Sequence, residues 1–154
     1  MALSGCGAQT DEKSSTYNDA IQLMGKDSVS DYKQAALMFD ELGDYKDAKV
    51  KSEVCWGNYA KGRFEIEEQG TYSPTKDDLT ETRDAFIHAN DDGKYDNYID
   101  RLNKEITYLT AREDIGNGDY ADALSLLEGL KDEKQAQDLI KSIQDRWCEI
   151  ISVN

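Results

Sequence analysis

The sequence predicts an all-α fold in which antiparallel helical hairpins stack as a short repeat array of about seven helices. Three observations support this prediction. Apolar residues recur at helical spacing along most of the chain, only one proline occurs in 154 residues, and no segment alternates apolar and polar residues as a strand does. Capping residues and periodicity place the helices at about 16–24, 31–42, 44–61, 75–90, 94–115, 119–130 and 132–151.

Four of these helical segments carry an apolar stripe that we expect to face the core. Residues three or four apart lie on one side of a helix, so each stripe marks a buried face. The stripes are Tyr32, Ala35, Phe39 and Leu42; Tyr95, Tyr98, Ile99, Leu102, Ile106 and Leu109; Tyr120, Ala123, Leu124, Leu127 and Leu130; and Ala136, Leu139, Ile140, Ile143, Trp147 and Ile150.

Composition favours one soluble helical domain, which we place at residues 16–154. The chain is 38% hydrophobic and 32% charged, and it is long enough to bury a core of its own. An internal joint is expected near residues 62–74, where Gly70, Ser73 and Pro74 interrupt the helical pattern. Ser73 would cap the next helix, with proline at its first helical position.

The charge balance excludes nucleic acid as an expected partner. The chain has 32 acidic and 18 basic residues, a net charge of −14, so it repels phosphate backbones and anionic lipid surfaces at long range. Within the expected joint, Glu65, Glu67 and Glu68 form either a solvated loop or a site for a cation or a basic ligand.

A six-residue phrase, GDYxDA, occurs twice, at Gly43–Ala48 and Gly118–Ala123. The glycine of each copy is expected to end a helix in a left-handed conformation, and the aspartate that follows, Asp44 or Asp119, is expected to cap the next helix. Because the phrase recurs, its first copy is a structural corner and not an appended acidic tag.

The second copy opens a pattern, GxYxxAxxxLxxL over Gly118–Leu130, that resembles the second-helix signature of tetratricopeptide repeats. The phrase LGDYKDA after AALMF is similar to the degenerate helical repeats of surface and membrane-attached proteins of Gram-positive bacteria. The resemblance covers roughly residues 17–61 and 94–145, with an irregular period and poorly matched first helices. It implies a stack of helices that presents a surface to a protein or peptide partner.

Near the N-terminus, Leu3-Ser4-Gly5-Cys6 resembles the cleavage and lipidation site of bacterial lipoprotein signal peptides. The resemblance implies that Cys6 is the lipid attachment residue and that the protein is extracytoplasmic, anchored to the outer face of the cytoplasmic membrane. Only two residues precede the motif, so we expect a truncated signal, followed by a disordered tether over residues 1–15. No apolar run approaches the roughly 20 residues that span a bilayer, and the chain without its lipid should be soluble.

The remaining reactive residues predict no catalytic site, cofactor or metal site. Cys55 and Cys148 are either two semi-buried thiols or a disulfide pair, and the single histidine, His88, is expected on a helix surface. One histidine makes a zinc site improbable, and no nucleophile or phosphate-loop motif occurs. We therefore expect a protein that is not an enzyme.

The sequence leaves two functional hypotheses. The first is a non-catalytic, lipid-anchored helical-repeat module that binds or positions another protein or peptide at the cell envelope. The second is an accessory lipoprotein that captures a glycan or small ligand, with some of the nine tyrosines stacking on it. No partner-binding residue is identified from the sequence.

Overall fold

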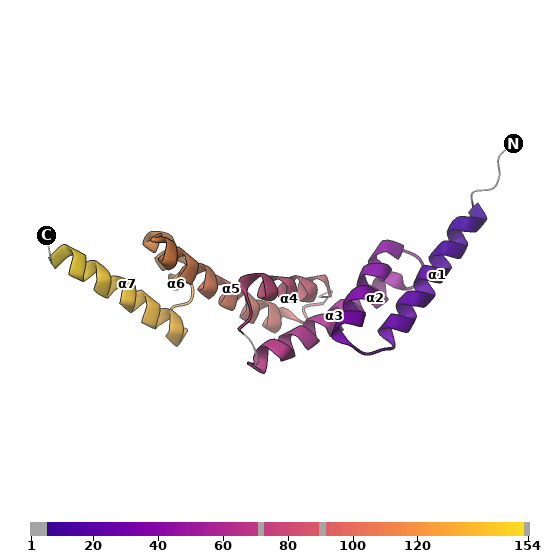
Figure 1. The fold of residues 1–154 in the computed structure, drawn as a ribbon, viewed down its shortest axis with the longest axis horizontal. Coiled ribbons are helices and arrows are strands. Elements are labelled where there is room, and N and C mark those ends of the chain that lie inside the picture. Colours follow the sequence, from indigo (N-terminus) through magenta and orange to yellow (C-terminus); the bar gives the residue numbers. More distant parts are fainter. Residues whose placement is uncertain (1–5, 71–72, 90–91, 153–154) are drawn as a thin grey trace. The chain divides into compact units, whose positions relative to one another are not determined.

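A computed structural model describes residues 6–70, 73–89 and 92–152, with side chains described from residue 11 to residue 146 within these ranges. The described residues form seven α-helices and no strand, which confirms the all-α fold (Figure 1). The helices are α1 (Cys6–Met24), α2 (Val29–Leu42), α3 (Ala48–Glu68), α4 (Lys76–His88), α5 (Asp96–Asn117), α6 (Tyr120–Glu128) and α7 (Lys134–Ser152).

The chain divides into two compact units. The first unit comprises Met1–Pro74 and Glu81–Ile99, and the second comprises Thr75–Thr80 and Asp100–Asn154. Both α4 and α5 contribute residues to each unit. A single domain over residues 16–154 therefore stays a prediction.

Helix α1 begins at Cys6, ten residues before the predicted start at residue 16. Residues 6–15 of the expected tether are thus helical, while residues 1–5 lie outside the described part of the chain. Alanine, glutamine, glutamate and lysine in this segment all have high helix propensity. The hydroxyl of Thr16 donates to the carbonyl of Glu12 at 3.1 Å, one turn earlier.

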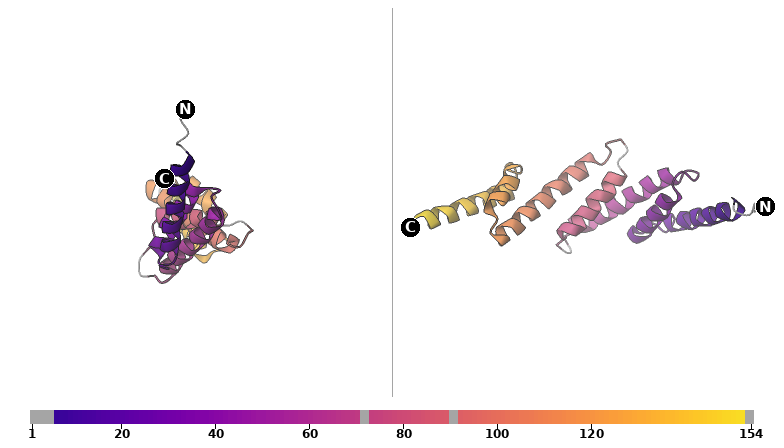
Figure 2. Two further views of the ribbon diagram at one scale, coloured as in Figure 1. Left: turned by 90° about the vertical axis from the view of Figure 1, so that its right-hand side faces the viewer. Right: turned by 90° about the horizontal axis from the view of Figure 1, so that it is seen from above.

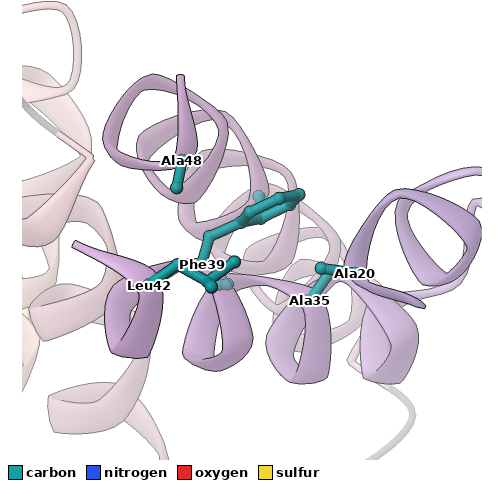
Figure 3. Close-up of a cluster of buried hydrophobic side chains, with 7 residues drawn as sticks. Ala20, Ala35, Phe39, Leu42 and Ala48 are labelled. Carbon is teal, nitrogen blue, oxygen red and sulfur yellow. The ribbon is translucent and has the colours of Figure 1, made fainter. Parts of the chain in front are cut away.

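The core of the first unit lies between α1, α2 and α3, which pack side by side (Figure 2). Small residues allow close approach: Ala20 of α1 and Ala35 of α2 face each other, and the ring of Phe39 extends from α2 toward α3 (Figure 3). The predicted stripe of α2 is confirmed, since Ala35 and Phe39 are fully buried and Leu42 is 5% exposed.

Side-chain bonds to backbone amides begin two of the helices. Ser28 caps α2 by accepting a hydrogen bond from the amide of Asp31 at 3.1 Å. Before α4, the hydroxyl of Thr75 accepts from the amide of Asp78 at 3.2 Å, and the carboxylate of Asp78 accepts from the amide of Thr75 at 2.9 Å. This is a capping box, and the predicted cap at Ser73 is wrong because Thr75 satisfies these amides.

Helix α3 continues to Glu68, so the predicted loop around the glutamates is wrong. Glu67 is held on the helix: it accepts a hydrogen bond from Thr82 of α4 at 2.9 Å and pairs with Arg63 at 3.6 Å. Gly70, with φ of 65°, follows the helix end. The break in the helical pattern is real, but it begins after residue 68.

The two GDYxDA segments share a feature at their glycines but start their helices differently. Gly43 and Gly118 both have positive φ, 58° and 90°, but Gly43, with ψ of −119°, is not in the predicted left-handed helical conformation. At the second corner the amide of Gly118 bonds to Ile115 O at 3.2 Å, and the amide of Asp119 bonds to Asp114 O at 2.8 Å. These two bonds form a Schellman motif that closes α5.

The predicted aspartate caps are wrong at both corners. Helix α3 starts only at Ala48, four residues after Asp44, with Asp47 at its N-cap position. Asp119 does occupy the N-cap position of α6, but neither it nor Asp47 makes a side-chain cap bond. The same hexapeptide thus begins a helix at its sixth residue in one place and at its third in the other.

At the first corner, DYKD packs on α1. The hydroxyl of Tyr17 donates to the carboxylate of Asp47, and this bond lowers the pKa of that carboxyl. Lys46 Nζ lies 4.3 Å from the centre of the Tyr17 ring, and Tyr45 contacts the same ring edge to face at 5.9 Å. These contacts give the segment a structural role.

The core of the second unit lies between the end of α5, α6 and α7. The predicted stripe of α6 is confirmed: Ala123 and Leu127 are fully buried and Leu130 is 8% exposed. On α7, Ala136 and Ile143 are buried. The side chains of the last two predicted stripe residues of α7 lie outside the described part of the chain.

Helix α3 and Tyr95, the residue before α5, approach each other closely at Gly57. A Cβ at Gly57 would overlap the hydroxyl of Tyr95 and lie 3.1 Å from its Cζ. Tyr95 is 5% exposed and packs on the fully buried ring of Phe86, with centroids 5.1 Å apart. Phe64 of α3 likewise meets Tyr98 of α5 at 5.1 Å. This aromatic cluster joins α3, α4 and α5 within the first unit.

Candidate partner-binding face

Two polar pairs join α2 to α4 within the first unit. Lys33 Nζ forms an ion pair with Glu81, and His88 Nε2 lies 3.3 Å from Asp40 Oδ1. Each pair joins residues that are 48 positions apart. Because both residues advance by seven from the first pair to the second, α2 and α4 run parallel. We call the surface formed by Lys33, Leu37, Asp40, Glu81 and His88 the α2–α4 face.

Asp40 is the common acceptor at one end of this face. Its carboxylate accepts hydrogen bonds from Ser52 and from the indole N–H of Trp56, the latter at 2.8 Å, in addition to the contact with His88. The Trp56 and His88 rings lie 5.3 Å apart at an interplanar angle of 46°. Ser52 is 2% exposed, so the cluster extends from the surface into the interior.

Leu37 provides the apolar group of the face. It is 47% exposed, although it belongs to a helix whose opposite side is fully buried. It follows Lys33 by four residues and precedes Asp40 by three, so it lies on the same side of α2 as both. Leu37 therefore gives this face one apolar group between two polar pairs.

At the other end of the face, the buried Tyr59 hydroxyl is hydrogen-bonded to Glu81. The hydrogen bond from Lys33, followed by one from Tyr59, lowers the pKa of Glu81. Burial, followed by the bond to Glu81, raises the pKa of Tyr59. Tyr59 is 4% exposed, so its hydroxyl stays protonated and donates to the carboxylate at any physiological pH.

Two kinds of reactive group can be checked among the described side chains, metal ligands and thiols. Among them, no three His, Cys, Asp or Glu residues gather as a metal site would require. Cys55 is a free thiol and fully buried, and burial raises its pKa to about 11. A thiol with that pKa is a poor nucleophile at neutral pH.

The structure places the residues singled out from the sequence as follows. Cys6 is the first residue of α1, and its side chain lies outside the described part of the chain, as do Leu3, Ser4 and Gly5. His88 lies exposed on α4, as expected for a surface histidine. Within the described residues, no helix combines the length and apolar character needed to cross a bilayer.

Comparison with known proteins adds no assignment. No family model, no curated protein and no solved structure matches the chain. Any functional conclusion therefore depends on the geometry of the chain itself.

Sequence reasoning missed the α2–α4 face. The signal was present in part, because Lys33 and Asp40 on one helix and Glu81 and His88 on the other repeat at the same seven-residue spacing. Side chains seven apart lie on one helix face about 10.5 Å from each other, so the two sets match in spacing. Nothing in the local sequence indicates that these two helices are neighbours.

Proposed function

We propose that this protein is a non-catalytic helical-repeat module that binds or positions another protein or peptide through the α2–α4 face. The observation that carries the proposal is the parallel pairing of α2 and α4. In a stack of helical hairpins, alternate helices run parallel and together line one surface, which is the surface such proteins use for binding.

A second contact supports the same arrangement within the first unit. From Gly57 to Phe64 of α3, the contacted residue advances from Tyr95, just before α5, to Tyr98 within it, so the chain entering α5 runs in the same direction as α3. Two interleaved sets of parallel helices, α2 with α4 and α3 with α5, are what stacked hairpins produce.

The net charge of the chain favours one class of partner. With a net charge of −14, the protein attracts basic surfaces and repels acidic ones at long range. We therefore propose a partner segment with basic residues and at least one apolar side chain that contacts Leu37. Binding should weaken as salt rises from about 0.05 to 0.5 M, because ions screen charges separated by more than about 10 Å.

The test is capture from envelope extracts with three forms of the whole chain as bait. These are the wild type, Leu37→Glu, and the matched control Val50→Glu. Val50 does not belong to the α2–α4 face. It is 59% exposed on α3 and lies six residues, about 120° around that helix, from Trp56, which contacts the face. A protein retained by wild type and Val50→Glu but lost from Leu37→Glu supports the proposal. Equal loss from both variants, or retention by both, would assign binding elsewhere.

We also propose that the module is lipid-anchored through Cys6 at the outer face of a bacterial cytoplasmic membrane. The support is the Leu3-Ser4-Gly5-Cys6 motif. Since α1 begins at Cys6, an acyl group there would join the first helix directly. With a signal sequence joined upstream, wild type should be acylated and membrane-bound and Cys6→Ala should be neither. Acylation that persists in Cys6→Ala would refute the anchor.

A further inference from the structure

The second unit contains a small pocket between the end of α5, the start of α6 and α7. Its volume is about 130 Å³, and its described lining is Ile115, Tyr120, Leu139, Ser142, Ile143 and Arg146. A cavity of about 150 Å³ accommodates a molecule as large as benzene, so this pocket suits one branched alkyl group of about leucine size.

The pocket has apolar walls and a rim of hydrogen-bond donors. Ile115, Leu139 and Ile143 supply the walls, and Ile143 is 2% exposed. At the rim, Arg146 Nη1 donates to the hydroxyl oxygen of Tyr120 at 3.2 Å. This bond uses one guanidinium N–H and a lone pair of the phenol, so the phenolic proton stays available for a ligand.

The rim therefore favours a ligand that accepts hydrogen bonds. The Arg146 side chain is exposed, and its bond to Tyr120 uses only one of the five guanidinium N–H groups. The hydroxyl of Ser142 adds another donor beside them. A guanidinium with adjacent hydroxyls matches the two oxygens of a carboxylate, and arginine binds carboxylates through paired N–H groups.

We propose that this pocket binds a carboxylate that carries a branched alkyl group of about leucine size. Two kinds of molecule have this chemistry: a peptide with a C-terminal leucine, and a free short-chain acid. The alkyl group enters the apolar walls and the carboxylate meets Arg146, Tyr120 and Ser142. The site lies in the second unit and does not depend on the α2–α4 face.

The net charge of −14 opposes any anion at long range, so the affinity must come from contacts inside the pocket. A ligand of this size with one charged bond is expected to bind with a Kd of about 1 mM. Such affinities are measurable by NMR titration of amide resonances. The amides to follow are those of α6 and α7 around the pocket.

The experiment titrates the full chain with three probes: acetyl-Gly-Gly-Leu as the free acid, the same peptide as its C-terminal amide, and 4-methylpentanoate. The peptide acid should bind about tenfold more tightly than the amide, because the amide lacks the charge that arginine recognises. Stronger binding of the peptide acid than of 4-methylpentanoate identifies a peptide C-terminus as the source. Equal or stronger binding of 4-methylpentanoate identifies a free acid.

Variants separate this recognition from nonspecific binding. Arg146→Gln should reduce the preference for acid over amide to less than about twofold. Arg112→Gln, an exposed arginine of α5 outside the pocket lining, should preserve it. Ser142→Phe, at an exposed position on the rim, should block all three probes. Circular dichroism should show all variants folded, because each change is at an exposed position.

Three results would overturn the proposal. They are equal affinity for the acid and the amide, no resonance shifts with any probe at about 10 mM, and an undiminished preference for the acid in Arg146→Gln. The first would assign the pocket to apolar binding alone. The second would show a packing gap without a ligand.

Discussion

Asp40 Oδ1 and His88 Nε2 lie 3.3 Å apart, although 48 residues separate them in the chain. Lys33 and Glu81 pair at the same separation in sequence. The two contacts set the register of α2 against α4 over about two helical turns. Asp40 contacts more residues than the other members of the face, because Ser52 and Trp56 of α3 donate to its carboxylate and the His88 ring of α4 lies beside it.

Replacing Asp40 by alanine should lower the free energy of unfolding by about 1–3 kcal/mol. The reason is that Ser52, which is 2% exposed, would lose the acceptor of its hydroxyl in a place that water hardly reaches. Urea unfolding followed by circular dichroism measures the change. Glu41→Ala, at the exposed neighbouring position, is the control and should change stability by less than about 0.5 kcal/mol. Equal effects of the two changes would contradict the role of Asp40.

Because of Glu81, the free energy of unfolding should depend on pH in the acid range. Its hydrogen bond from Lys33 lowers its pKa in the folded state below the value of about 4.3 in an unfolded chain. Its contribution is therefore present at neutral pH and is lost as pH falls through the folded pKa. The difference in stability between wild type and Glu81→Gln should be largest near pH 7 and should shrink as the pH falls below the unfolded-state pKa of about 4.3.

The size of that difference should stay below about 1 kcal/mol, because the Glu81 side chain is 42% exposed and solvent screens the ion pair. Glu41→Gln makes the same charge change at an exposed position of α2 and is the matched control. If the stability difference between wild type and Glu81→Gln grew as the pH fell, the predicted direction of the Glu81 pKa shift would be wrong.

Gly57→Ala should destabilise the first unit, and a change in Tyr95 should relieve the effect. The new Cβ would overlap the Tyr95 hydroxyl, and overpacking of this kind costs about 1–3 kcal/mol. In Tyr95→Phe the hydroxyl is absent and the nearest ring atom lies 3.1 Å from that Cβ. The double variant should therefore lose less stability than the sum of the single variants. Additive losses in thermal melts would show that the two residues do not meet.

The two corner glycines should tolerate alanine poorly, whereas a nearby helical glycine should tolerate it well. Gly43 and Gly118 have positive φ, which costs a residue with a side chain about 1–2 kcal/mol. Gly116 lies within α5, and a Cβ added there would meet no atom within 4 Å, so Gly116→Ala should raise stability by about 0.5–1 kcal/mol. Thermal midpoints of the three variants test this order, and a loss at Gly116 would contradict it.

Removing a capping side chain should lower stability only where that side chain bonds to a helix amide. Ser28→Ala and Thr75→Ala each remove a bond to a helix amide and should cost about 1 kcal/mol. Asp44→Ala should cost less than about 0.5 kcal/mol, because Asp44 precedes α3 by four residues and caps no helix. The denaturant midpoints of the three variants measure these losses. A large loss at Asp44 would restore the cap that the sequence suggested.

Local pattern was enough to predict the helical class and much of the buried faces, although Tyr98, predicted in the buried stripe of α5, is 36% exposed. Phe39 and Leu127 each lie in a stripe of three- and four-residue spacing, and both are fully buried. Such a stripe depends only on residues within one helix, which is why it can be read from the sequence alone. Helix starts were harder, because Ser73 and Thr75 are both good caps and only the bond with Asp78 decides between them.

Long-range pairing could not be predicted in the same way. The identical residues of the two GDYxDA segments follow different paths because their surroundings differ. Tyr17 of α1 holds Asp47 in the first copy, whereas a Schellman motif directly precedes the helix in the second. Likewise, nothing near Asp40 in the sequence indicates that His88 is its neighbour. Contacts across 48 residues depend on the packing of whole helices.

The buried thiol of Cys55 allows unfolding of the first unit to be measured separately from unfolding of the second. An alkylating reagent reacts with the thiolate, and burial together with a pKa of about 11 suppresses that form in the closed state. Alkylation of Cys55 must therefore wait for α2 and α3 to separate, and its rate reports the equilibrium between closed and open forms of that unit. With Cys6 and Cys148 replaced by serine, one mass measurement would follow the opening of the first unit while the second unit contributes no signal. The rate of Cys55 alkylation thus measures local unfolding of the first unit.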